Sequence, residues 1–210
     1  MILSHLLLPL LPVACSATTL SAEGVLDAID FQFVPWGNAY FNTTQCGGAD
    51  GYSKDDMFCW VKQCNVAAPA PECFNASQSP VLCQHGPGEC QQDALEGCAF
   101  AVADSVKDAW SFLRCFEGTH HSALGSAAEC AQGAGIDYGS IQKCTKGPQA
   151  EKIDVANAMA TVKLGSAKLG TPWVLVDGTL VGGGPPYTNL LDVVCESLRK
   201  AGGDVPKGCH

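Results

Sequence analysis

The alternation of apolar and polar residues predicts a short strand early in the chain, followed by a loop-rich stretch. Ile29, Phe31 and Phe33 fall at every second position, which is typical of a half-buried strand, and Pro35-Trp36-Gly37 ends it. Residues 42–92 lack enough periodic apolar residues to hold themselves together. Six cysteines lie in this stretch, so disulfides are the expected crosslinks.

The period becomes helical in the middle of the chain. Between residues 94 and 117 the apolar residues recur on one face, which predicts one amphipathic helix. Shorter helices are expected over 126–132 and 152–164, with Gly165 as a stop signal.

The last third predicts two strands and a closing helix. Residues 173–176 (WVLV) form an apolar run that is typical of a strand buried on both faces. Asp177-Gly178 is a type I′ turn signal, so residues 179–181 should return as the hairpin partner. Apolar residues at helical spacing over 190–198 predict a helix that Gly202 ends.

This order of elements predicts an α/β fold. It resembles a thioredoxin-like fold that is interrupted by a disulfide-rich helical insertion. We therefore expect one domain over residues 1–210, with the cysteine-rich insertion at about residues 46–165.

Composition limits the class of function. The net charge is −9 and only 12 of 210 residues are Lys or Arg, so the basic surface of a nucleic-acid binder is missing. No apolar segment is long enough to predict a membrane span.

Thirteen cysteines are the most informative feature of the composition. So many thiols favour an oxidising compartment, and possible N-glycosylation sites at Asn42 and Asn75 agree with the secretory pathway, lysosomal or extracellular. No Cys-x-x-Cys occurs, which argues against a structural zinc site and against a visible redox centre. We expect no metal and no cofactor, and the spacing leaves the disulfide connectivity open.

Residues 1–17 allow two interpretations. They are apolar and end in small residues, as a signal peptide does, and cleavage after Ala17 would remove Cys15 and leave twelve cysteines. They lack a positive start, however, and Pro9 and Pro12 interrupt them. The other interpretation is a folded helix that Pro9 ends.

Histidines offer one candidate for chemistry. His85 lies between Cys83 and Cys90, where it is either half of a Cys–His nucleophilic pair or a residue that orients a loop. We favour the loop-orienting role because no third group that orients a base is indicated. His120-His121 lies in a polar turn and is expected to be solvated.

Residues 83–98, CQHGPGECQQDALEGC, resemble the signature of the gamma-interferon-inducible lysosomal thiol reductase (GILT) family, C-Q-H-G-x-x-E-C-x-x-N-x-x-x-x-C. One fixed position departs, since Asp93 stands where the family has Asn. The positions that match or replace signature residues are Cys83, Gln84, His85, Gly86, Glu89, Cys90, Asp93 and Cys98.

Other segments resemble the same family in the same order, over about residues 25–200. Residues 34–39 (VPWGNA) resemble its VPYGNA segment, and residues 130–144 resemble its middle helices. Residues 171–174 and Asp177-Gly178 resemble its VPW-x-x-x-NG strand.

This resemblance implies a thioredoxin-like fold and reduction of disulfides in proteins delivered to acidic compartments, so disulfide-containing proteins are the expected partners. The family's reaction uses a Cys-x-x-Cys, which this chain lacks. One explanation places the dithiol just upstream of Met1, with Ile2–Pro9 as the first helix of the fold. The other is a signal peptide on a relative that lost its dithiol. We favour the first, and expect little reductase activity from the chain as written.

The resemblance also carries expectations about single residues. Pro172 is expected to be cis and to face the dithiol, with the Thr171 backbone pairing with the substrate chain. Cys83, Cys90 and Cys98 are expected to be disulfide-bonded and structural. The cysteines available to them as partners in the preceding loop are Cys59, Cys64 and Cys73. The alternative function is that of a non-catalytic, secreted cysteine-rich binding or structural protein that keeps the fold.

Overall fold

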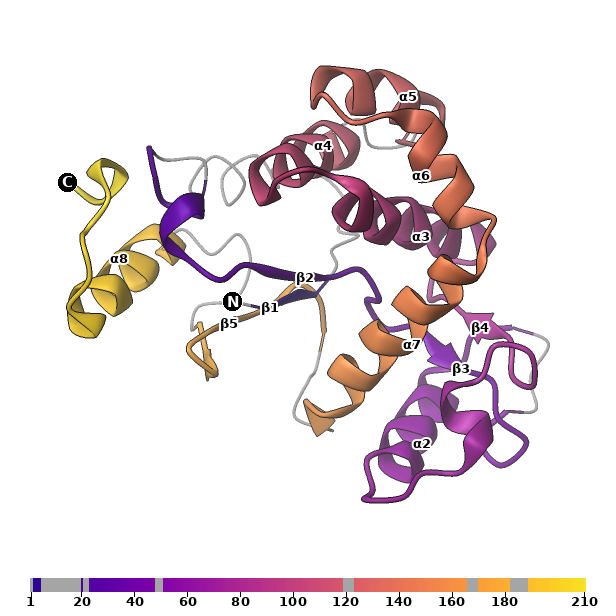
Figure 1. Ribbon diagram of the computed structural model, residues 1–210. Helices are drawn as coiled ribbons and strands as arrows, with labels where there is room; N and C mark the ends of the chain where they lie inside the picture. Colours follow the sequence, from indigo (N-terminus) through magenta and orange to yellow (C-terminus); the bar gives the residue numbers. More distant parts are fainter. Residues whose placement is uncertain are drawn as a thin grey trace. The chain divides into compact units, whose positions relative to one another are not determined.

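The computed structural model describes residues 2–4, 20, 23–47, 51–118, 123–165, 170–181 and 189–210. This part of the chain is mostly helical and has a four-stranded sheet, a two-stranded sheet and six disulfides (Figure 1). The strands are β1 (Ile2–Ser4), β2 (Gln32–Val34), β3 (Tyr40–Phe41), β4 (Val81–Leu82), β5 (Trp173–Val176) and β6 (Thr179–Leu180). The α-helices are α2 (Lys54–Cys64), α3 (Pro87–Val102), α4 (Val106–Gly118), α5 (Ala123–Gly133), α6 (Tyr138–Thr145), α7 (Pro148–Val162) and α8 (Leu190–Ala201). Short 3-10 helices are η1 (Leu26–Ala28), η2 (Pro71–Phe74) and η5 (Lys207–Cys209).

The chain divides into two compact units. The sheet unit comprises Met1–Phe33, Ala99–Tyr138 and Pro172–His210, and the signature unit comprises Val34–Cys98 and Gly139–Thr171. Residues 46–165, which we predicted as one insertion, contribute to both units.

The sheet unit is built around β5. The strand order is β2-β1-β5-β6, and β5 pairs antiparallel with β1 and with β6. The predicted hairpin is confirmed, because Asp177 and Gly178 join β5 to β6 with φ values of 49° and 75°. Two positive φ values are what a type I′ turn requires.

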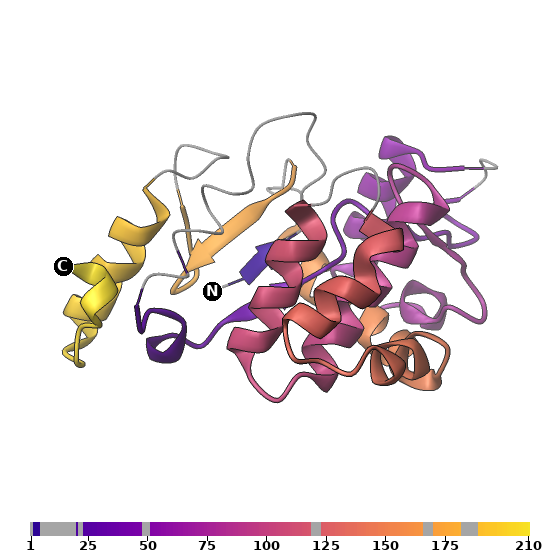
Figure 2. The ribbon, with the colours of Figure 1, turned by 90° about the horizontal axis from the view of Figure 1, so that it is seen from above.

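The closing helix α8 packs against β5, and Figure 2 shows the two side by side. Leu190 and Val194 on α8 are buried with Val174 of β5 in one apolar core. Gly202 has a φ of 73° and ends the helix as predicted. The disulfide Cys195–Cys209 ties the last residues of the chain back to α8.

The single helix predicted over 94–117 is wrong, because α3 and α4 are separate helices. Ser105 begins α4: its hydroxyl accepts a hydrogen bond from the Asp108 N–H at 3.1 Å and donates one to the Asp108 carboxylate at 2.7 Å. Such a side-chain cap stabilises a new helix start, and the amphipathic pattern does not reveal it. Helices over the predicted 126–132 and 152–164 are confirmed as α5 and α7.

Residues 42–92 are more ordered than the loop-rich pattern predicts. Ser53 caps α2 by accepting a hydrogen bond from the Asp56 N–H at 3.3 Å. The buried Trp60 of α2 lies in an aromatic cluster with Trp36, Phe41 and Phe74, whose ring centroids are 5.4–6.4 Å apart. These aromatic contacts, together with disulfides, form a core that periodicity along the sequence does not show.

The helix predicted over Ile2–Pro9 is wrong at its start, since Ile2–Ser4 is a strand. Ile2, Leu3 and Ser4 pair with Leu175, Val174 and Trp173. Pairing with a central strand overrides the weak helix propensity of so short a segment. The rest of this predicted helix and the possible signal cleavage at Ala17 lie outside the described residues.

Candidate functional site

The signature loop is closed by a disulfide between its first and second cysteines. Cys83 follows β4, Cys90 lies in the first turn of α3, and their Cα atoms are 5.6 Å apart. Gly86 turns the chain between them with a φ of 93°, a conformation that favours glycine, and its N–H donates to the Cys83 carbonyl at 3.0 Å. The loop is therefore a compact cap on the start of α3.

Glu89 stabilises this loop through its contacts with His85. Its carboxylate accepts a hydrogen bond from the His85 backbone N–H at 2.6 Å and lies 3.3 Å from His85 Nδ1. The Glu89 side chain is only 8% exposed, whereas that of His85 is 49% exposed. Glu89 also lies in the first turn of α3, where the helix dipole favours a negative charge.

This geometry bears on the two roles considered for His85. Cys83 and Cys90 are bonded to each other, so neither is a thiolate that His85 activates in this structure. The interpretation of His85 as half of a Cys–His nucleophilic pair is therefore wrong for this state. Its contacts with Glu89 fit a residue that orients the loop.

The signature loop contacts the VPWGNA segment, although the two lie far apart in the sequence. The Asn38 amide donates to the Gln84 side-chain oxygen at 2.7 Å across 46 positions. Gly37, with a φ of 55°, makes the turn that presents Asn38. Both motifs are recognisable in the sequence, but their contact is not, since only the fold brings them together.

Tyr52, which no sequence motif singled out, lies near Glu89, and its ring packs against that of Tyr40. Burial, with smaller contributions from the Glu89 charge and Tyr40, raises the pKa of Tyr52 to about 12. Burial likewise raises the pKa of Tyr40, whose hydroxyl accepts a hydrogen bond from the Ser53 N–H at 3.3 Å. Both phenols are therefore neutral at physiological pH.

Helix α3 carries a row of buried acidic residues behind the loop. Glu89, Asp93 and Glu96 share one helical face at positions i, i+4 and i+7, and their exposed fractions are 9%, 4% and 0%. Asp93, which departs from the family's Asn, has its Oδ2 4.0 Å from Cys83 Sγ. Asp93, the residue that differs from the signature, is therefore buried against the Cys83–Cys90 disulfide.

The carboxyl end of the signature is held by a disulfide and by close packing of two helices. Cys98, which is fully buried, is bonded to Cys144 of α6. Gly97 beside it allows α3 to approach α7 closely, because a Cβ there would lie 2.7 Å from Ile153 Cγ2. Larger side chains at position 97 would force these helices apart.

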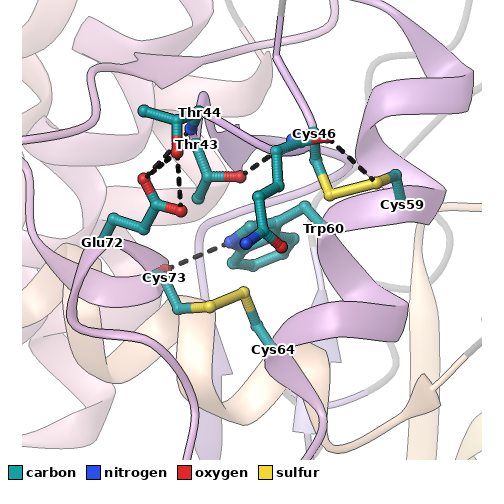
Figure 3. Close-up of a disulfide and its surroundings, with 9 residues drawn as sticks. Thr43, Thr44, Cys46, Cys59, Trp60, Cys64, Glu72 and Cys73 are labelled. Atoms are coloured by element: carbon teal, nitrogen blue, oxygen red, sulfur yellow. Dashed lines mark hydrogen bonds between the residues drawn. A yellow bond between two sulfur atoms is a disulfide. The ribbon is translucent and has the colours of Figure 1, made fainter.

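The four cysteines of residues 46–73 form two disulfides with one another and stabilise α2. They are not partners of the signature cysteines, which corrects our expectation that Cys59, Cys64 and Cys73 are available to them. Figure 3 shows the disulfides Cys46–Cys59 and Cys64–Cys73 on either side of Trp60, whose indole N–H donates to the Cys73 carbonyl at 3.1 Å. In the same view the Glu72 carboxylate accepts from the Thr44 N–H at 3.0 Å and from its hydroxyl at 2.9 Å.

All twelve cysteines in the described part of the chain are in disulfides. Cys83, Cys90 and Cys98 are bonded as we predicted, and Cys15 lies outside the described residues. Every disulfide contains at least one buried cysteine. Among the described residues, no group of three or more His, Cys, Asp or Glu side chains is arranged to hold a metal ion.

Thr171 and Pro172 directly precede β5 and are half-buried. Trp173, the next residue, pairs with Ser4 at the carboxyl end of β1. The placement of a dithiol upstream of Met1 stays a prediction. Residues 5–10 (HLLLPL) contain no cysteine. The cis form of Pro172 stays a prediction.

The predicted glycosylation sites lie in the signature unit. Asn42 and Asn75 are both half-buried. The Asn75 side-chain oxygen accepts a hydrogen bond from the Ser77 N–H at 3.0 Å, which forms a local turn.

Comparison with known proteins finds similarity to one family. Residues 61–134 match the model of the family described as Gamma interferon inducible lysosomal thiol reductase (GILT). The resemblance to the GILT family is confirmed. This match contains the whole signature loop and helices α3 to α5, but not β5.

Two curated relatives agree. The chain is 30% identical over 131 residues to the Gamma-interferon-responsive lysosomal thiol protein of Arabidopsis thaliana, covering 62% of this chain and 54% of that protein. It is 24% identical over 128 residues to the GILT-like protein C02D5.2 of Caenorhabditis elegans, covering 60% of this chain and 37% of that protein. The matches thus span about half or less of these GILT relatives. No helix among the described residues is long and apolar enough to cross a membrane.

Proposed function

We propose that the protein acts in the reduction of disulfides in other proteins, as a thiol–disulfide oxidoreductase of the GILT type. The observation that carries this proposal is the family match across the signature loop, whose disulfide, Gln84–Asn38 contact and buried Glu89 form one fixed structure. The multiple disulfides fit the secretory pathway. We place the protein in a lysosomal or extracellular setting, with glycans at Asn42 and Asn75.

The proposed reaction requires a dithiol. One thiolate attacks a sulfur of the substrate disulfide, which forms a mixed disulfide and releases the other substrate sulfur as a thiolate. The second thiol then attacks the mixed disulfide, which frees the reduced substrate and leaves the two reductase sulfurs bonded. Two external thiols, or one external dithiol, supply the two electrons that regenerate the dithiol and become a disulfide themselves.

The cysteines of the described part of the chain do not supply this dithiol, because each is already bonded. We propose that they form the scaffold of the reductase. The signature loop stabilises the start of α3, while Thr171 and Pro172 position the substrate chain beside the end of β1. The attacking thiols have to be supplied at that same place.

A gain-of-function experiment tests this proposal. His5→Cys with Leu8→Cys introduces a Cys-Leu-Leu-Cys directly after Ser4, whose partner Trp173 is the residue that follows Pro172. The matched control is His5→Ser with Leu8→Ser. Insulin reduction near pH 5, with a small dithiol as the electron source, is measured for the unmodified chain and for both variants.

The unmodified chain and the serine control should stay near background, and the cysteine variant should exceed them by about tenfold or more. Mass spectrometry that finds the six native disulfides intact in all three chains makes the comparison valid. A correctly bonded cysteine variant that stays at background would contradict the reductase proposal and favour the non-catalytic binding protein. Robust turnover by the unmodified chain would show that a cysteine we place in the scaffold exchanges with substrate.

A further inference from the structure

One disulfide of the sheet unit, Cys115–Cys130, differs from the other five in the described part of the chain by the exposure of one cysteine. Cys115 of α4 is exposed, whereas Cys130 of α5 is only 1% exposed. The ten cysteines of the other five disulfides are buried or half-buried. Exposed disulfides are the labile ones, because an attacking thiolate has to reach one of the two sulfurs.

The packing of α4 accounts for this exposure. Phe112 and Phe116 are fully buried on one face of the helix, and their rings stack with centroids 5.3 Å apart. Ser111 and Cys115 lie one turn apart on another face, and both are exposed. A thiol in solution can therefore approach Cys115 while this residue is bonded to α5.

The contact between the two helices does not depend on this disulfide alone. Helix α5 packs along α4, and Ala127 and Ala131 are fully buried on either side of Cys130. Burial of these apolar groups stabilises the helix pair whether or not the sulfurs are bonded. We therefore expect both helices to stay in place when the disulfide opens.

We propose that Cys115–Cys130 is a redox-sensitive disulfide that small-molecule thiols open and close, with Cys115 as the residue they modify. An external thiolate attacks the Cys115 sulfur and forms a mixed disulfide, while the Cys130 sulfur leaves as a thiolate and takes up a proton. A second thiolate attacks the outer sulfur of the mixed disulfide, which releases Cys115 as a thiolate that also takes up a proton. The two external thiols become a disulfide, and their two electrons stay on the protein.

This exchange differs from the proposed reductase reaction. Cys115 lies in the last turn of α4, where the helix dipole disfavours a thiolate. That turn, CFEG, contains no Lys, Arg or His to offset the effect. The reduced pair is therefore a poor attacking dithiol near pH 5, and the proposal can hold or fail whatever the insulin assay shows.

The test uses the full chain with its disulfides formed, and dithiothreitol as the small dithiol. After treatment under native conditions at about pH 8, where thiolates form, samples are quenched with acid and alkylated. Mass spectrometry of the peptides then gives the opening rate of each pair. Cys115–Cys130 should open at least about tenfold faster than Cys64–Cys73, in which both cysteines are buried, and circular dichroism should show that the helices persist.

Two cysteine variants identify the modified residue. Cys130→Ala leaves Cys115 as an exposed free thiol, and the matched Cys115→Ala leaves Cys130 as a buried one. Each is treated with glutathione disulfide, so that the protein thiolate attacks one sulfur and glutathione leaves as a thiolate. Cys130→Ala should take up one glutathione at least about tenfold faster than Cys115→Ala.

Two variants of Ser111 test the attack on Cys115 with all the disulfides retained. Ser111→Glu adds a negative charge one turn from Cys115, which should slow opening by the anionic thiolate about threefold. Its matched control, Ser111→Gln, has the same size without the charge and should leave the opening rate unchanged. These variants decide the question even if a cysteine variant fails to fold.

Four results would overturn the proposal. Another disulfide that opens as fast or faster would show that the exposure of Cys115 does not direct the thiol. Equal uptake of glutathione by the two folded cysteine variants would exclude Cys115 as the preferred residue. An unchanged opening rate in Ser111→Glu would place the attack elsewhere, and loss of the helical signal on opening would exclude reversible exchange.

Discussion

At the scale of single residues, Asp154 on α7 gives the clearest dependence of stability on pH. Burial, and then the nearby Glu151 charge, raise the pKa of Asp154 to about 6. The folded state therefore binds a proton more tightly than the unfolded chain does. This group stabilises the fold most below its unfolded pKa near 4, and its contribution is lost as pH rises through about 6.

Asp154→Asn is accordingly expected to stabilise the protein at pH 7 by about 2 kcal/mol, since a neutral amide avoids the cost of a buried charge. The difference from the unmodified chain should shrink to near zero at pH 4. Urea unfolding of the oxidised chains at both pH values measures this. The control Glu151→Gln should give a smaller gain at pH 7, because it removes only the secondary cause. A variant that is no more stable than the native chain at pH 7 would contradict the account.

At the scale of elements, local signals were predicted well and tertiary contacts were not. The Asp177-Gly178 hairpin and the Gly202 helix end follow from backbone rules that a few residues carry, and both are confirmed. The break between α3 and α4 depends on one side-chain cap at Ser105, which an amphipathic pattern hides. The strand at Ile2–Ser4 depends on pairing with β5, over 160 residues away.

The candidate site shows the same division. Its residues were recognisable as a motif, because the signature is long and specific. Its contacts were not, since disulfide connectivity does not follow from spacing. The contact between Gln84 and Asn38 and the burial of Tyr52 near Glu89 likewise depend on the folded chain.

The loop at the start of α3 yields a prediction at this scale. Glu89→Gln removes the charge that strengthens the hydrogen bond from the His85 N–H, and the variant should lose about 1–2 kcal/mol of unfolding free energy. The exposed neighbour Gln91 provides the control, and Gln91→Ala should change stability by less than about 0.5 kcal/mol. Urea unfolding at pH 7 compares the two. Equal stability of the Glu89 variant and the control would mean that Glu89 does not hold the loop.

At the scale of the whole molecule, disulfides that close long loops should stabilise the fold most. Cys98–Cys144 joins positions 46 apart, whereas Cys83–Cys90 joins positions 7 apart. Chain entropy predicts a cost of about 4 kcal/mol for removing the first disulfide and about 2 kcal/mol for the second. Double Cys→Ala variants of each pair, compared by urea unfolding, measure this ordering. A larger cost for the shorter loop would show that local packing outweighs chain entropy.

The central claim is that the twelve cysteines of the described residues form a structural scaffold and not a reactive dithiol. Disulfide mapping of the native, unreduced protein after labelling of its free thiols tests it most directly. The account predicts six linked peptides with the pairs found here, and no label on Cys83, Cys90 or Cys98. Stoichiometric labelling of any of these three, or a link from Cys83 to a cysteine other than Cys90, would contradict it.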